Sequence, residues 1–246
     1  GMPCTPAVFE RKTKWRAYDD PLEEGPPESR GNYSSVGDTV DEIKELLLQV
    51  PEPSPGDVFL DFEGDPFVGD QGLEYLTGWT TLENGSSHYE ERWALDAIDE
   101  KAALVAFLDA VAAAQKRHPT MHVYHFGVYE PGALKRLCSR HDTHLDLLDE
   151  LLRGGRFIDL HRITREALRI GVDRYGLKQL EPLHSFVRQF ELEDASVACR
   201  NLELALELGD KQQIDDELRA QVADYNREDC ESTASLRDWL QQLRQI

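Results

Sequence analysis

The stretch that most constrains this chain is residues 58–66, Val-Phe-Leu-Asp-Phe-Glu-Gly-Asp-Pro, which starts as a hydrophobic strand and ends in a turn. Side chains alternate between the two faces of a strand, so Asp61 and Glu63 point to the same face. Two like charges on one face of a hydrophobic strand are costly unless a cation neutralises them. The stretch therefore predicts either half of a site for a hard divalent metal ion or a strand end where both carboxylates meet solvent.

The chain is long enough to bury a substantial core, because 246 residues with 40% hydrophobic side chains suffice for one sizeable domain. No apolar run approaches the roughly 20 residues that a membrane-spanning helix needs. The N-terminal residues do not show the charged start followed by an apolar segment that is typical of a secretory signal. The four cysteines are scattered without Cys-x-x-Cys spacing. This favours reduced thiols in a cytoplasmic protein over a disulfide framework or a zinc site.

We expect two regions. Residues 1–56 are predicted to be a proline-rich, acidic and poorly structured lead-in that holds one short helix at about 39–49 and ends in an extended Pro-x-Pro-x-Pro linker. Residues 57–246 are predicted to form one folded domain. Because Met2 follows Gly1 at the start, we also expect the chain to be a piece of a longer protein.

The hydrophobic patterns of the folded region alternate between strand and helix periods. The expected strands are 58–63, 73–81, 87–94, 121–126 and 157–160. The expected helices are 96–117, 130–140, 145–152, 162–169, 177–183, 201–208 and 215–243. Short turns join the first three strands into an antiparallel meander, and a helical crossover makes the last two parallel. The prediction is an α/β fold of the ribonuclease-H-like type, with a central mixed five-stranded sheet flanked by helices.

Two further places in this layout supply acids. A strand ends near Phe126, Gly127 allows a sharp turn, and Glu130 then opens a helix, where a carboxylate is also common for purely electrostatic reasons. In the last helix, Tyr225 and Asp229 are four residues apart and project from one face. An exposed, charge-rich surface helix is the alternative interpretation of that spacing.

Taken together, these motifs resemble a known family. The order Asp61-x-Glu63, then His125 to Glu130, then Tyr225-x-x-x-Asp229 resembles the DnaQ-like DEDD 3′–5′ exonucleases, in the variant with Tyr in the third motif. Residues 61–67, 73–76 and 175–181 look more closely like the YprB-type ribonuclease-H-like domain. That domain accompanies RecB-like nuclease and helicase modules in larger bacterial proteins.

The resemblance implies a metal-dependent nuclease that hydrolyses phosphodiester bonds of nucleic acid from the 3′ end, with single-stranded DNA favoured over RNA. It implies two divalent ions, Mg²⁺ or Mn²⁺, held by Asp61, Glu63, Glu130 and Asp229. Such ions stabilise the attacking and leaving oxygens. Tyr225 would orient the attacking water, because a phenol of pKa about 10 is a poor base at neutral pH. The implied partners are nucleic acid and helicase or RecB-like modules, without a membrane.

Two positions depart from the family pattern, since Phe126 stands where Asn is usual and Glu130 where Asp is usual. These departures favour an alternative function, a catalytically weak module that binds nucleic acid or docks a helicase. A third hypothesis, a metal-dependent phosphohydrolase that does not act on nucleic acid, uses the same carboxylates. We expect Asp159 on the fifth strand to be structural and His125 to be packed or hydrogen-bonded.

The net charge of −20 argues against phosphate binding over the whole surface. The charge is uneven, however, because residues 153–178 contain seven basic and three acidic side chains, a local charge of +4. This segment predicts either a groove that follows a nucleic-acid strand, with Lys135 and Arg136 adding to it, or a solvated helix surface with pairs such as Arg162–Glu166.

Overall fold

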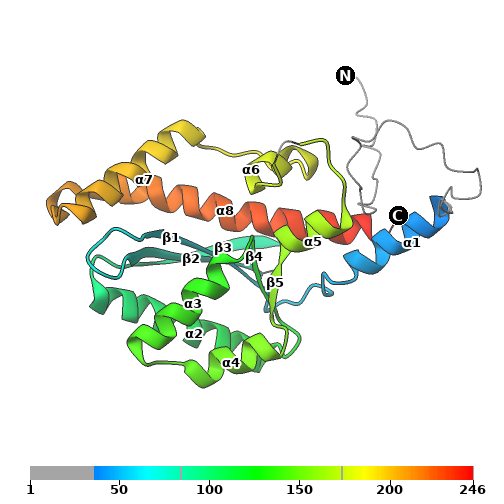
Figure 1. The fold of residues 1–246 in the computed structure, drawn as a ribbon, viewed down its shortest axis with the longest axis horizontal. Helices are drawn as coiled ribbons and strands as arrows, with labels where there is room; N and C mark the ends of the chain where they lie inside the picture. The colour runs from blue at the N-terminus through cyan, green and yellow to red at the C-terminus, as the bar shows by residue number, and fades with distance from the viewer. Residues whose placement is uncertain (1–35, 84, 173, 246) are drawn as a thin grey trace, which may run out of the picture.

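The computed structural model describes residues 36–83, 85–172 and 174–245. At its centre is a five-stranded sheet in the order β3-β2-β1-β4-β5 (Figure 1). The strands are β1 (Val58–Asp65), β2 (Leu73–Glu83), β3 (Ser86–Trp93), β4 (Val123–His125) and β5 (Phe157–Asp159). The pairs β1–β2 and β2–β3 are antiparallel, whereas β1–β4 and β4–β5 are parallel. The predicted mixed sheet and its ribonuclease-H-like layout are therefore confirmed.

Helices cover both faces of the sheet (Figure 1). They are α1 (Val36–Leu47), α2 (Ala97–Arg117), α3 (Tyr129–His141), α4 (Leu145–Arg153), α5 (Leu160–Ala167), α6 (Leu177–Leu180), α7 (Leu192–Glu207) and α8 (Asp216–Leu243), with short 3₁₀ turns at Glu181–Leu183 and Lys211–Gln213. Within the described ranges, none of these helices has the length and apolarity to cross a bilayer.

The alternation along β1 decides which face meets which helices. Val58, Leu60 and Phe62 pack into a core cluster with side chains of α2, α3 and α4. Phe59 points the other way, into a cluster with α5 and α8. Asp61 and Glu63 lie two and four residues after Phe59, on the same face of the strand, so they face α8.

Some element boundaries differ from the predicted ones. The helix expected at 201–208 begins at Leu192, because Glu193 and Asp194 favour a helix start and Ala195, Ala198 and Leu202 continue its buried face. The helix expected at 162–169 begins at Leu160, because the Asp159 carboxylate accepts a hydrogen bond from the Arg162 backbone N–H and caps the helix. The structural role expected for Asp159 is thereby confirmed.

The short helix expected in the lead-in is α1. Leu47 at its end and Val50 beyond it are buried against α5 and α8. The Gln241 side chain of α8 donates to the backbone carbonyl of Val50 at 3.2 Å. The rest of the predicted lead-in, residues 1–35, lies outside the described residues, and the boundary at residue 57 stays a prediction.

Candidate metal centre

Three of the predicted acids converge. One carboxylate oxygen from each of Asp61, Glu63 and Asp229 lies within 4.8 Å of the others. Asp61 and Glu63 come from β1, and Asp229 comes from the middle of α8, which packs across β1 and β2. The strand period and the helix packing thus bring Asp229 to two side chains that are 168 and 166 residues before it in the chain.

The three acids carry more negative charge than their surroundings balance. Burial raises the pKa of Asp61 well above its usual range, and the charges of Glu63, Asp229 and Glu130 raise it further. Burial, together with Asp229, raises the pKa of Glu63 to about 8. A divalent cation would relieve this repulsion, and clustered carboxylate oxygens are the ligands that Mg²⁺ and Mn²⁺ prefer. The residues present therefore fit a divalent metal ion.

Glu130 lies beside this cluster without belonging to it. It is buried at the start of α3, and its Oε2 has no hydrogen-bond partner among the described residues. Nδ1 of His125 lies 3.5 Å from that oxygen and 2.7 Å from the Gly127 carbonyl oxygen. The packed, hydrogen-bonded histidine expected at this position is confirmed. The structure thus brings together three of the four predicted metal ligands and places the fourth near Asp61.

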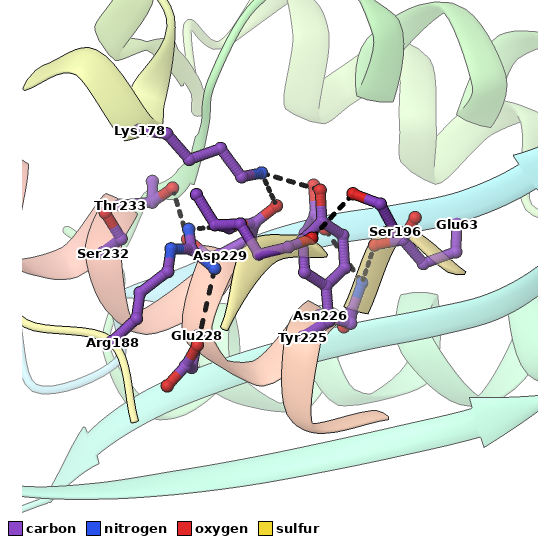
Figure 2. A network of polar contacts seen from close by, with 12 residues as sticks. Glu63, Lys178, Arg188, Ser196, Tyr225, Asn226, Glu228, Asp229, Ser232 and Thr233 are labelled. Atoms are coloured by element: carbon purple, nitrogen blue, oxygen red, sulfur yellow. Dashed lines mark hydrogen bonds and ion pairs between the residues drawn. The ribbon is translucent and has the colours of Figure 1, made fainter. Parts of the chain in front are cut away.

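Tyr225 and Asp229 both contact the ammonium group of Lys178. Nζ of Lys178 donates to Tyr225 Oη at 2.7 Å and to Asp229 Oδ2 at 2.8 Å (Figure 2). Although burial opposes it, the charge of Asp229 and the hydrogen bonds to Asp229 and Tyr225 raise the pKa of Lys178, which therefore stays charged. Burial and Asp229 raise the pKa of Tyr225 to about 12, so its hydroxyl keeps its proton at neutral pH.

The other oxygen of Asp229 is held by Arg188, a side chain that the sequence did not single out. The Arg188 guanidinium ion-pairs with Asp229 Oδ1 and, at 2.6 Å, with Glu181 Oε1. It lies in the loop before α7, and no local motif marks it. Lys178, by contrast, lies within the segment 175–181 that carried the family resemblance.

Asn226 is a further residue that the motifs alone did not indicate. It is fully buried, and its Nδ2 donates to Asp61 Oδ2 at 2.9 Å and approaches Glu63 Oε1 at 3.5 Å. Its own Oδ1 accepts a hydrogen bond from the Tyr89 hydroxyl at 2.8 Å, which fixes the orientation of the amide. Asn226 therefore holds the two β1 carboxylates in place.

Gly78 makes room for this amide. It pairs with Asp61 across β1 and β2, and a Cβ added there would lie 1.7 Å from Asn226 Oδ1. We expect Gly78→Ala to displace Asn226 and to weaken Mn²⁺ binding about 10- to 100-fold, as measured by calorimetric titration. The matched control is Gly171→Ala, because a Cβ there meets no atom within 4 Å. Equal Mn²⁺ affinity in the two variants would contradict this role of Gly78.

The raised pKa of Glu63 predicts a pH dependence. Without metal, the folded protein keeps a proton on Glu63 that the unfolded chain releases above its usual pKa of 4.5. This group's contribution to folding stability therefore falls as pH rises from about 4.5 to about 8. A metal ion must displace that proton, so we expect the rise in Tm caused by Mn²⁺, relative to EDTA, to grow between pH 6 and pH 8.5. Glu63→Gln should flatten this trend, and a pH-independent Mn²⁺ effect in the wild type would count against it.

The family comparison agrees with this site. A family model described as the RNase_H superfamily (RNase_H_2) matches residues 58–241. No curated protein and no solved structure matches the chain. The matched range begins at the first residue of β1 and ends within α8, so it includes the whole acid cluster. The chain belongs to the ribonuclease H superfamily.

Proposed function

We propose that this protein is a metal-dependent nuclease that removes nucleotides from the 3′ ends of single-stranded DNA with two divalent ions, Mg²⁺ or Mn²⁺. Membership in the ribonuclease H superfamily supports a nuclease-type function on nucleic acid. The observation that carries the proposal is the convergence of Asp61, Glu63 and Asp229, whose crowded negative charges call for a divalent cation. The 3′ polarity and the helicase or RecB-like partner modules rest on the motif resemblance.

Each side chain then has a distinct task. Asp61, Glu63 and Asp229, with Glu130 beside them, would hold the ions. Bound ions would supply Lewis-acid stabilisation of the attacking and leaving oxygens of the phosphodiester. Asn226 orients the β1 carboxylates, and Arg188 fixes Asp229.

Tyr225 acts as a hydrogen-bond donor in this scheme. Lys178 has donor hydrogens only, so the Tyr225 oxygen accepts from it, and the hydroxyl hydrogen is left for another partner. We infer that this hydrogen is donated to the substrate phosphate or to the attacking water. The role of orienting the water, rather than deprotonating it alone, agrees with the raised pKa of Tyr225.

The test uses single-stranded DNA labelled at its 5′ end, with a free or a chemically blocked 3′ end, in Mg²⁺, Mn²⁺ or EDTA. We expect progressive shortening from the free 3′ end in either metal and none in EDTA or with the blocked end. An RNA strand of the same sequence measures the sugar preference. Internal cleavage of the blocked strand would instead indicate an endonuclease.

A second candidate function is a catalytically weak module that binds nucleic acid or docks a helicase. Specific observations favour it: Glu130 lies outside the three-acid cluster, and Lys178 and Arg188 already occupy both oxygens of Asp229. Binding of the labelled strand without shortening in either metal would select this function.

A further inference from the structure

A groove of about 950 Å³ opens at the carboxyl ends of β4 and β5. We propose that this arginine groove, which is lined by Phe126, His161, Arg162, Arg165, Arg174 and Tyr175, holds the single-stranded DNA as it approaches the acid cluster. The inference rests on the proposed function for the identity of the strand, but it concerns side chains outside the metal centre.

Two walls of the groove lead toward the acid cluster. In the parallel pair of β1 and β4, Phe59 lies opposite Tyr124. Two residues beyond this pair lie Asp61 in β1 and Phe126, the first residue after β4, so the Phe126 wall begins near the first metal-ligand candidate. The opposite wall, Tyr175-Gly176, leads directly into α6, whose Lys178 binds Asp229. Figure 1 shows α5 and α6 on the same side of the sheet as α8.

The groove presents positive charge in an otherwise acidic protein. Its two carboxylates are already engaged, because Asp159 Oδ1 accepts from the backbone N–H groups of Gly127 and Arg162, and Glu166 pairs with Arg162 at 3.3 Å. Arg165 and Arg174 are exposed and form no ion pair with any carboxylate in the described parts of the chain. Two such guanidinium groups suit the phosphates of a nucleic-acid backbone.

Aromatic side chains favour a single strand over a duplex. The rings of Phe126 and His161 lie 5.1 Å apart between centroids and form part of the wall. The Tyr175 hydroxyl is tied to the backbone of Leu168 and Ile170, which fixes its ring. Val128 at the rim is 84% exposed. Unpaired bases can stack on aromatic rings, whereas the bases of a duplex are hidden inside the double helix.

The structure also shows that two of the basic side chains considered for the groove do not line it. Arg136, which was expected to add to the groove, forms an ion pair with the buried carboxylate of Glu74 and lines a different pocket, beside the turn after β1. Arg153 pairs with Asp149 on α4. The positive charge of the groove therefore comes mainly from α5 and from the segment before α6.

The test measures binding of a 5′-fluorescein-labelled oligothymidylate in EDTA by fluorescence anisotropy, with Arg165→Glu/Arg174→Glu as the groove variant. The control, Arg117→Glu/Arg153→Glu, makes the same change in net charge at exposed positions on α2 and α4. We expect the groove variant to bind at least about tenfold more weakly, while the control changes less than about twofold. Losing two phosphate contacts should reduce the slope of log Kd against log salt by about 1.4.

The outcomes separate this inference from the proposed function. If the wild type binds DNA without cutting it and the groove variant loses binding, the nuclease proposal fails and the groove stands. If the wild type cuts DNA and the groove variant binds and cuts equally well, the groove is overturned and the nuclease stands. No wild-type binding, equal binding of a duplex of the same length, or tighter binding of oligouridylate would overturn the assignment to single-stranded DNA.

Discussion

Replacing Asp61 by Asn is expected to abolish the proposed metal-dependent cleavage while leaving the fold intact. The substitution keeps the shape of the side chain and removes one of three converging negative charges. We expect kcat/KM on single-stranded DNA to fall by a factor on the order of 1000, or ~4 kcal/mol of transition-state stabilisation. The accompanying measurements are calorimetric Mn²⁺ titration and thermal melting.

The melting data distinguish loss of a metal ligand from misfolding. Burial and the neighbouring charges of Glu63 and Asp229 raise the pKa of Asp61, so its ionised form destabilises the metal-free protein. At pH 8, Asp61→Asn should therefore melt at the same temperature as the wild type or higher in EDTA, and lose the stabilisation by Mn²⁺.

The control for this prediction is Asp109→Asn, the same chemical change on the exposed side of α2. It should keep both cleavage and the Mn²⁺ effect. Asp229→Asn is a less clean test, because it also weakens the ion pairs with Lys178 and Arg188. Cleavage by Asp61→Asn at more than about a tenth of the wild-type rate would rule out the assigned role, since a tenfold change corresponds to only ~1.4 kcal/mol.

Replacing Arg237 by Leu is expected to have the largest effect on stability. Arg237 Nη1 lies 2.7 Å from Asp57 Oδ2, and both side chains are buried. The guanidinium also lies over the rings of Phe59 and Tyr124, with its carbon 4.9 and 5.2 Å from their centroids. Removing it takes away the arginine that balances the buried Asp57 carboxylate, which should cost about 3–5 kcal/mol and lower the Tm by about 10 °C.

This ion pair joins the end of α8 to the start of β1. Asp57 also accepts hydrogen bonds from the backbone N–H groups of Ser54 and His122. The double variant Asp57→Asn/Arg237→Leu removes both buried charges, so it should be less destabilised than Arg237→Leu alone. Arg153→Leu breaks an exposed pair with Asp149 and should cost no more than about 0.5 kcal/mol. Chemical denaturation measures all three, and a cost below about 1 kcal/mol for Arg237→Leu would refute the prediction.

Much of this architecture could be predicted from the sequence because it depends on local periods. Alternation along residues 58–63 predicted a strand with Asp61 and Glu63 on one face, and helical spacing placed Tyr225 and Asp229 together. The order of strands and helices then followed from hydrophobic patterns and turns. Boundaries were less predictable where acidic residues occupy the first turn of a helix, as Glu193 and Asp194 do after Leu192.

Only the tertiary structure decided how the site is completed. The packing of α8 across β1 and β2 places Asn226 in the space left by Gly78 and brings Asp229 to the β1 carboxylates. The same packing lets Lys178 and Arg188, 51 and 41 residues before Asp229 in the chain, bind its two oxygens. Glu130, at the start of α3, lies beside the cluster and outside it. These contacts join segments that are distant in the chain, and no local period encodes them, because they depend on how whole elements pack.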